Sequence, residues 1–298
     1  MKDLLQFLVA GVAVGTLYAL VALGFVIIYK ATGIINFAQG ALALVGAYLT
    51  YNFSQTWRLP FFVSVVLAVM ACGALGLLIE RVILSRMVGQ PVFAVIMITI
   101  GLSIVIDQAV IMIWGGGTLP LDDPWQLSTI QLGDITVPES DLARIVVAAV
   151  LLATFFLFFK FSVLGVAMRA TASDQEAALA QGISVRRIVG VTWAVAAGIA
   201  TTAGVLLASG GRGVEPSLSV IALVAFPAVI LGGLDSPGGS VVGGIVIGIV
   251  EVLTAGYSDK LPEFLGTNFQ RVTPYVVLVL ILLVRPYGLF GTREVQRV

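Results

Sequence analysis

The sequence predicts an all-α polytopic membrane protein with about nine transmembrane helices. Of its 298 residues, 59% are hydrophobic and only 11% are charged, whereas a soluble domain carries about 25% charged residues. Nine apolar runs approach the length of roughly 20 residues that a helix needs to cross a bilayer. Together these observations predict a single transmembrane domain over residues 1–298.

The nine runs are separated by short polar segments, and one boundary has two interpretations. The first run is too long for the apolar region of a signal peptide, so it is expected to remain as a membrane helix. The seventh and eighth runs are short and flank the sequence GLDSPGG at 233–239. Residues 234–256 therefore either cross the bilayer or include a re-entrant segment, which puts the count between eight and ten. The predicted spans are 4–29, 34–53, 61–84, 92–114, 142–159, 188–208, 217–234, 240–256 and 273–290.

Two polar segments set the predicted orientation in the membrane. Residues 115–141 contain five acids and no base, whereas residues 160–187 contain four bases. Basic residues in short loops favour the cytoplasmic side, so 160–187 is predicted to lie inside and 115–141 outside. The acids of the predicted external loop are Asp122, Asp123, Asp134, Glu139 and Asp141.

The composition excludes several classes of function. The chain has no histidine and one cysteine, Cys72, which excludes a Ser-His-Asp triad and argues against a zinc or haem site. The formal net charge is zero, so there is no basic signal for nucleic-acid binding. We therefore expect neither an enzyme nor a protein that carries its own cofactor or metal.

The polar segment 160–187 is predicted to contain one short helix. Ser173 and Glu176 have the spacing of a capping box, in which each side chain accepts a hydrogen bond from the other residue's N–H. Strong helix formers follow, and Gly182 stands where a helix commonly ends in a left-handed residue. A helix of about eight residues is not stable alone. It is therefore expected to pack either on its own membrane domain or against a cytoplasmic partner protein.

Polar side chains inside the predicted spans are candidates for a transport path, because they are costly to bury in lipid. Asp107 and Gln108 lie in the fourth span, and Glu251 lies in the eighth. The alternative is that these side chains form hydrogen bonds between helices or reach the outer interface. Glu80 and Arg81, at the inner end of the third span, are expected to be interfacial anchors.

The second span begins with two further polar residues, Asn36 and Gln39, followed by Gly40. One interpretation is ordinary capping of a helix at the membrane surface. The other is a half-helix whose positive end points into the protein, an arrangement that transporters use at their binding sites.

A weak internal similarity predicts an inverted repeat. Residues 36–47 (NFAQGALALVGA) align without gaps with residues 215–226 (EPSLSVIALVAF). The first segment begins on the predicted inner face and the second on the outer face, which is the relation that an inverted repeat requires. The resulting prediction is that residues 36–40 and 215–219 form paired gates on the two sides of one pathway.

Four longer stretches carry a resemblance when they are taken together. They are GIINFAQGALALVGAYLTY at 33–51, TIGLSIVIDQAVIMIWG at 99–115, GVAMRATASDQEAALAQGISV at 165–185 and AFPAVILGGLDSPGGSVVGGIVIGIVE at 225–251. This combination resembles the permease subunits of branched-chain amino-acid ABC importers of the LivH type, over nearly the whole chain. The resemblance implies transport of leucine, isoleucine and valine. The alternative within the same wider family is a permease for urea or a short amide.

The resemblance also implies partners. In ABC importers a short cytoplasmic helix of the permease sits in a cleft of an ATPase subunit, so 160–187 is implied to be the coupling loop. The chain has no GxxxxGK[ST] pattern, which is the P-loop that cradles ATP, so ATP is expected on separate chains. The implied partners are two cytoplasmic ATPase subunits, a LivM-like sister permease and a periplasmic substrate-binding protein, assembled in a bacterial inner membrane.

Two sets of residues are the resulting candidates for function. The set implied for ATPase coupling is Gly165, Arg169, Asp174, Glu176, Ala177, Gly182, Arg186 and Arg187. The candidates for the translocation path are Asn36, Gln39, Gly40, Asp107, Gln108, Glu215 and Glu251. A stand-alone secondary transporter or channel is the less favoured alternative, because ion coupling would call for more acids near the bilayer midplane.

Overall fold

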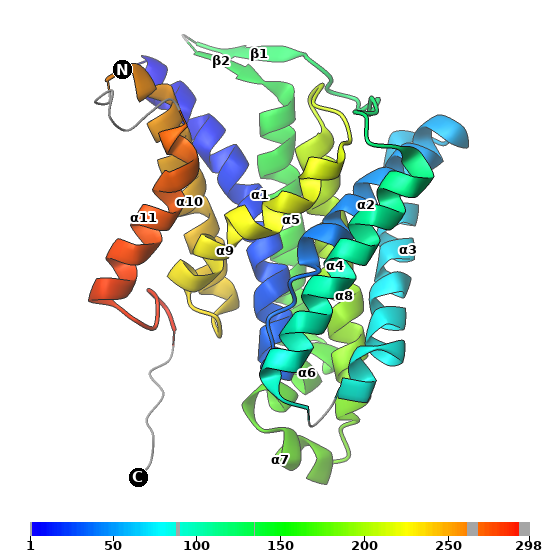
Figure 1. The fold of residues 1–298 in the computed structure, drawn as a ribbon. Coiled ribbons are helices and arrows are strands. Elements are labelled where there is room, and N and C mark those ends of the chain that lie inside the picture. Colours follow the sequence, from blue (N-terminus) through cyan, green and yellow to red (C-terminus); the bar gives the residue numbers. More distant parts are fainter. Residues whose placement is uncertain (1, 88–89, 134, 261–267, 292–298) are drawn as a thin grey trace.

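A computed structural model describes residues 2–87, 90–133, 135–260 and 268–291 of the chain. Six of the described helices are long and apolar enough to cross a membrane, and Figure 1 shows them gathered in one elongated bundle. The chain is therefore a multi-pass membrane protein with an α-helical membrane domain. The six long helices are α1 (Lys2–Thr32), α3 (Phe61–Val82), α4 (Val92–Trp114), α5 (Glu139–Phe161), α8 (Val185–Ala208) and α10 (Pro237–Gly256).

Shorter elements connect and complete the bundle. The short α-helices are α2 (Gln39–Tyr51), α6 (Val163–Ser173), α7 (Gln175–Ala180), α9 (Ile221–Gly232) and α11 (Phe269–Val284). A π-helix η1 (Asn52–Thr56) and 3₁₀-helices η2 (Leu84–Met87), η3 (Pro216–Val220) and η4 (Ser258–Lys260) adjoin them. Strands β1 (Thr129–Leu132) and β2 (Ile135–Pro138) form an antiparallel hairpin. The hairpin and α7 lie at opposite ends of the bundle, called here the hairpin end and the α7 end (Figure 1).

Each of the nine predicted spans contains a helix, but three of these helices are shorter than predicted. In the span 34–53 the helix α2 begins only at Gln39, because residues 34–36 have no regular structure and a turn follows them. In 217–234 the α-helix α9 begins at Ile221, and in 273–290 the helix α11 ends at Val284. Non-helical backbone at membrane depth must be shielded by protein or line a cavity. The starts of α2 and α9 are accordingly enclosed by longer helices.

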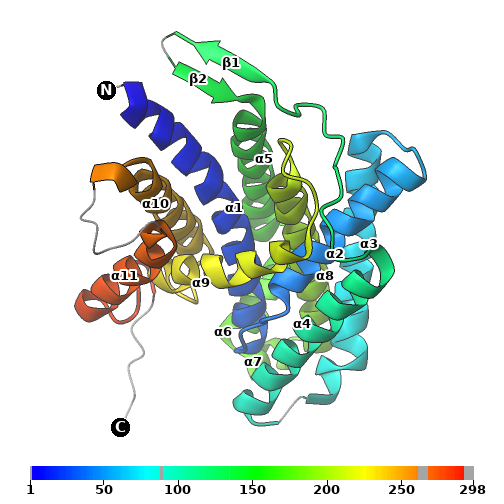
Figure 2. The ribbon, with the colours of Figure 1, turned by 45° about the horizontal axis from the view of Figure 1, so that its top comes forward.

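Helix α1 is the centre of the bundle and is buried over most of its length. It packs along α10 and also contacts α5, α8 and α9 (Figures 1 and 2). A second extensive contact joins α3 to α8. Both pairs are antiparallel, and together they form the framework on which the shorter helices pack.

Small residues allow both pairs to approach closely, as is common for helices in membranes. A Cβ added at Gly248 of α10 would lie 2.3 Å from the Cα of Gly15 in α1. In the second pair, a Cβ added at Gly76 of α3 would lie 2.7 Å from the Trp193 carbonyl oxygen of α8. Backbone atoms occupy these positions, so neither glycine can be replaced without moving a helix.

The acidic segment 115–141 is folded against the end of the bundle. Leu119 forms an isolated bridge with Val214, and the Asp123 carboxylate accepts a hydrogen bond from the Gly210 N–H at 2.9 Å. The hairpin follows, with Thr129 opposite Pro138. An all-α chain is thus too simple a description of this end. Asp134, which is one of the five predicted outer acids, lies outside the described residues.

A buried arginine holds the hairpin end together. Arg144 of α5 pairs with Asp141 one turn earlier, at 2.5 Å between Nη1 and Oδ1. Its Nε and Nη2 donate to the carbonyl oxygens of Leu206 and Ser209, at 3.0 Å and 2.9 Å. These carbonyls are at the end of α8, where no further helical N–H is available to them. The arginine therefore joins the start of α5 to the end of α8.

Replacing Gly248 by alanine should destabilise the protein by about 1–3 kcal/mol, because the added methyl group overpacks the α1–α10 contact. The matched control is Gly73→Ala on α3, where the added Cβ would lie 3.4 Å from the Ala194 carbonyl oxygen in ordinary contact. Thermal unfolding of the two purified variants in detergent measures the difference. Equal melting temperatures would show that the α1–α10 contact does not limit stability.

Candidate functional site

Helix α6 folds back tightly on the end of α5. Ser162, between the two helices, accepts a hydrogen bond from the Gly165 N–H at 2.9 Å and caps α6. A Cβ added at Gly165 would lie 2.5 Å from the carbonyl oxygens of Phe158 and Phe159, so this position has no room for a side chain. The Arg169 guanidinium donates to the Phe159 carbonyl oxygen and lies 5.5 Å from the centre of its ring. Gly165 and Arg169 therefore fix the corner between α5 and α6.

The corner between α6 and α7 differs from the predicted capping box. The sequence predicts one helix in this segment, whereas the structure has two. Ser173 is the last residue of α6, and Asp174, with extended backbone, is the N-cap of α7. The Asp174 Oδ1 accepts a hydrogen bond from the Ala177 N–H at 2.9 Å. The predicted pairing of Ser173 with Glu176 is wrong, because the serine is still helical and the aspartate takes the capping position.

The end of α7 confirms the predicted role of Gly182. Its φ of +79° lies in the left-handed region that glycine adopts without strain. The Gly182 N–H donates to the Leu179 carbonyl at 2.9 Å, and the Ile183 N–H donates to the Ala178 carbonyl at 3.0 Å. These two bonds are the Schellman pattern, which satisfies the last carbonyls of a helix. Gly182 thus turns the chain from α7 towards α8.

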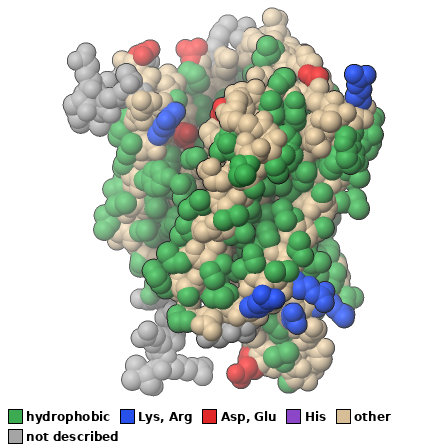
Figure 3. Space-filling view, turned by 45° about the vertical axis from the view of Figure 1, so that its right-hand side comes forward, with side chains coloured by type: hydrophobic (Ala, Val, Ile, Leu, Met, Phe, Trp, Pro, Cys, Tyr) green, Lys and Arg blue, Asp and Glu red, His purple; other side chains and the backbone are tan. Residues whose placement is uncertain are grey.

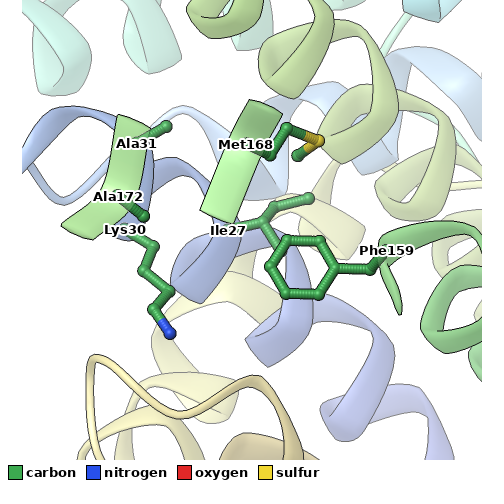
Figure 4. Close-up of a pocket in the computed structure, with 6 residues that line it drawn as sticks. All are labelled: Ile27, Lys30, Ala31, Phe159, Met168 and Ala172. Atoms are coloured by element: carbon green, nitrogen blue, oxygen red, sulfur yellow. The ribbon is translucent and has the colours of Figure 1, made fainter. Parts of the chain in front are cut away.

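The pair α6–α7 is anchored on the end of α1. The Gln175 side chain of α7 donates to the Ala31 carbonyl oxygen of α1 at 3.1 Å. Figure 4 shows the apolar contact between α6 and α1, in which Lys30 points its ammonium group away from the other side chains. A void of about 10 Å³, at the lower limit of what can hold one water molecule, remains there and is lined by Ile27, Lys30, Ala31, Phe159, Met168 and Ala172. A displacement of α7 would therefore act directly on α1.

The tip of α7 is exposed. Only Ala178 among the residues of α7 is buried, and the Leu179 side chain is 57% exposed. Arg186 and Arg187, in the first turn of α8, are also exposed, and Figure 3 shows a group of basic side chains at this end. The predicted coupling residues that face solvent are Asp174, Glu176, Ala177, Gly182, Arg186 and Arg187.

Asn36 and Gln39 fasten the start of α2 inside the bundle. Both side chains are buried. The Asn36 Oδ1 accepts from the Ala38 N–H at 3.0 Å, and the Gln39 Nε2 donates to the Ala196 carbonyl oxygen of α8 at 3.1 Å. Gly24 of α1 provides the space, since a Cβ there would lie 1.9 Å from the Gln39 Nε2. The half-helix interpretation of this segment therefore agrees with the structure better than capping at a membrane surface.

Three of the polar segments meet where α2 crosses η3. A Cβ added at Gly40 would lie 2.0 Å from the Ser219 carbonyl oxygen, so the two backbones touch. Asp107 of α4 interacts with the same serine, and its buried Oδ1 has no hydrogen-bond partner among the described residues. Buried polar atoms are nearly always paired, and acids inside membrane spans commonly serve transport. Asp107 is therefore the strongest candidate for the path.

The other three candidates lie apart from this crossing. Gln108 is exposed on the surface of α4. Glu215 is exposed at the hairpin end, where its Oε2 accepts a hydrogen bond from the Thr118 hydroxyl at 3.4 Å. The Glu251 Oε2 accepts a hydrogen bond from the Tyr18 hydroxyl at 2.7 Å, between α10 and α1. For Glu251 the structure therefore favours the alternative of a bond between helices.

A cavity of about 930 Å³ opens at the α7 end, between the ends of α1, α3, α4, α7 and α8. Asn36 and Thr99 line it, together with Glu80, which is only 5% exposed. Glu80 is thus more than the interfacial anchor that the sequence predicts. The position of Glu80 at the end of an apolar run marked it in the sequence as unusual. Trp193 also lines the cavity, but nothing in the sequence marked it.

A family of membrane proteins accounts for this architecture over almost its whole length. The family described as the permease component of branched-chain amino acid transport systems matches residues 7–284. The chain belongs to this family. Its resemblance to such permeases, first seen in four stretches of sequence, is thereby confirmed.

Curated relatives of this permease match it from end to end. The high-affinity branched-chain amino acid transport system permease protein BraD of Pseudomonas aeruginosa is 30% identical, over 99% of this chain and 98% of its own length. The corresponding protein LivH of Escherichia coli K12 is 29% identical, over 99% and 97%. A more distant relative is the galactofuranose transporter permease YtfT of E. coli K12, at 25% identity over 90% and 76%. The family relation therefore fixes the fold and the type of protein more firmly than the substrate.

Replacing Asp174 by alanine should loosen α7, because loss of an N-cap costs a helix about 1 kcal/mol. Amide hydrogen exchange of residues 177–181 should then speed up about fivefold, which is the factor that corresponds to this energy. The matched control is Ser173→Ala, which should leave exchange unchanged. Faster exchange in the Ser173→Ala variant alone would show instead that Ser173 caps α7.

Proposed function

We propose that this permease is the membrane-spanning subunit of an ATP-driven importer for branched-chain amino acids in the bacterial inner membrane. The observation that carries the proposal is the family match over residues 7–284, and relatives named for branched-chain amino acid transport align with nearly the whole chain. A periplasmic binding protein delivers leucine, isoleucine or valine at the hairpin end. The chain carries no ATP or other cofactor itself, and two separate ATPase subunits bind the nucleotide.

The α7 tip is the proposed contact with an ATPase. Its exposed Leu179 and small Ala177 would fill a cleft, in the manner of a helix packed into a groove. Arg186 and Arg187 lie in the first turn of α8, where the helix dipole disfavours positive charge. Acidic groups on a partner would compensate for this unfavourable position. ATP-driven closure of the ATPase pair would displace α7, and the bond from Gln175 to the end of α1 would pass the movement into the bundle.

An inverted repeat is the proposed plan of the bundle. In this plan α1, α2, α3 and α4 correspond to α8, α9, α10 and α11. The contact between α1 and α10 then corresponds to the contact between α8 and α3, and the structure contains both. The contact between α2 and α4 likewise corresponds to the contact between α9 and α11. The plan makes nine membrane segments, of which α2 and α9 are the related half-helices. Their crossing at Gly40 and Ser219, beside Asp107, is the proposed gate.

A sister permease is the proposed neighbour of α4. This helix packs mainly on α2 and η3 and leaves a long face uncovered. Gln108 lies on that face, about 9 Å from the end of the helix at 1.5 Å per residue. A glutamine exposed to lipid at this depth is costly, whereas small and polar residues are enriched where membrane helices pack together. The exposed face contains Met97, Gly101, Ile104, Gln108 and Met112.

Reconstitution with the ATPases, the sister permease and the binding protein should give ATP-dependent uptake of radiolabelled leucine into vesicles. Replacing Leu179 by arginine should abolish most of this uptake, because the charge cannot enter an apolar cleft. The same variant should lose the ATPase subunits during purification. This chain alone should transport nothing uphill.

The matched control for the coupling test is Leu127→Arg at the hairpin end, where the leucine is 81% exposed. This variant should retain the ATPase subunits on purification. Uphill uptake by the chain alone would contradict the proposed function, and full coupling in the Leu179 variant would contradict the role of α7.

A photoreactive benzoylphenylalanine at position 108 should cross-link the sister permease in membranes, because the proposed interface covers this side chain. The control is the same amino acid at Val150 of α5, which is 61% exposed and expected to face lipid. Mass spectrometry identifies the product. Capture of lipid alone at position 108, or of a second copy of this chain, would overturn the proposed pairing.

A further inference from the structure

The cavity at the α7 end has three chemically different walls. Its volume of about 930 Å³ falls within the range of about 300–1,000 Å³ that is usual for small-molecule sites. One wall is apolar, with Ile28 of α1 and Val92 and Val95 of α4. Another is basic, with three arginines at the ends of α3 and α8 and in η2, namely Arg81, Arg86 and Arg186. The third holds the carboxylate of Glu80.

Glu80 is held at the contact between α3 and α8. Its Oε2 would lie 3.2 Å from a Cβ added at Gly190, so the carboxylate rests against the backbone of α8. Arg186 is four residues before Gly190 and therefore on the same face of the helix. Arg186 and Arg81 are the charged groups that interact with the carboxylate. A buried carboxylate gains stability from any further cation placed beside it.

A tryptophan whose indole N–H is buried also lines the cavity. The indole Nε1 of Trp193 has no acceptor among the described residues, and the side chain is 2% exposed. Buried donors without a partner are rare in proteins. Arg186, Val189 and Trp193 follow one another at helical spacing along one face of α8 and all line the cavity. The Nε1 itself has almost no accessible surface, so Arg186 is the group on this face that an acceptor in the cavity could meet.

We propose that this cavity binds a free amino acid with an apolar side chain, at the α7 end of the permease. The ammonium group would meet Glu80, and the carboxylate would meet Arg186 and Arg81. The aliphatic side chain would lie against Ile28 and the valines of α4. This assignment rests on the proposed function, since it takes the ligand to be the imported product.

Occupation of the cavity should inhibit the transporter. Gln175 and Leu179 of α7 line the cavity, and Gln175 also binds the end of α1. A ligand that fills the space between α3, α8 and α7 would resist the displacement of α7 that coupling requires. Product that accumulates inside the cell would then slow its own import.

Binding of radiolabelled leucine to the purified complete transporter, in nanodiscs and without the binding protein, tests the site directly. The Glu80→Gln variant should bind leucine about tenfold more weakly, because it loses a charge-assisted hydrogen bond to the ammonium group. Arg81→Gln, at an exposed position, should also weaken binding. The matched control is Glu139→Gln at the hairpin end, which should bind as the wild type does. Unfolding temperatures establish that the variants are folded.

Two leucine analogues separate amino-acid recognition from simple anion binding. 4-Methylpentanoate lacks the ammonium group and leucinamide lacks the carboxylate, so each should compete with leucine at least several-fold less well. Equal competition by 4-methylpentanoate or by inorganic phosphate would show an anion site and overturn the proposal. Absence of leucine binding to the folded wild type would overturn it as well.

The proposed inhibition by bound leucine is tested in vesicles that contain the whole transporter. The initial rate of ATP hydrolysis during uptake should fall when the α7 side is preloaded with leucine, and the fall should be smaller in the Glu80→Gln variant. No uptake into unloaded vesicles would mean that the proposed function has failed. Normal uptake that is insensitive to preloaded leucine would leave that function standing and reject the inhibition.

Discussion

The polar backbone of two broken segments must be satisfied inside a membrane, and the architecture of this permease depends on how that is done. α2 and α9 both start within the bundle instead of at its ends. Non-helical backbone at membrane depth must be shielded by protein or line a cavity, and Asn36 before α2 lines one. Gln39 fills the space left by Gly24 and binds the Ala196 carbonyl, while Gly40 lets α2 touch η3. α2 therefore packs along the long helix α8, and α9 packs along α10 and α1.

The same arrangement connects the α7 end to the centre of the bundle. Gln175 binds Ala31 in the last turn of α1, and the chain then leads through residues 33–35 to the buried Asn36. Beyond it lies the crossing near Asp107, whose carboxylate oxygen lacks a partner among the described residues. A shift of α7 would thus reach the proposed gate through one hydrogen bond and the short connection from α1 to α2.

The two ends of the molecule differ in how they are built. At the hairpin end the Arg144 side chain is buried and makes hydrogen bonds to the end of α8, so α5 and α8 are fixed to each other. At the α7 end a large cavity separates the helix ends, and its charged walls belong to different helices. A rigid end and a loosely packed end suit a subunit that receives substrate at one face and mechanical work at the other.

The sequence alone determined the membrane class, the helical segments, the opposite placement of segments 115–141 and 160–187, and the end of α7 at Gly182. These features follow from apolar run length, charge and local glycine chemistry, all of which depend on residues that are close together in the sequence. Tertiary structure decided that Asp174 rather than Ser173 caps α7, that α2 starts at Gln39, and that Glu80 faces a cavity. The last two depend on atoms that are far away in the chain, because a crossing or a cavity exists only after distant helices have packed. The choice of cap depends on α6 continuing through Ser173.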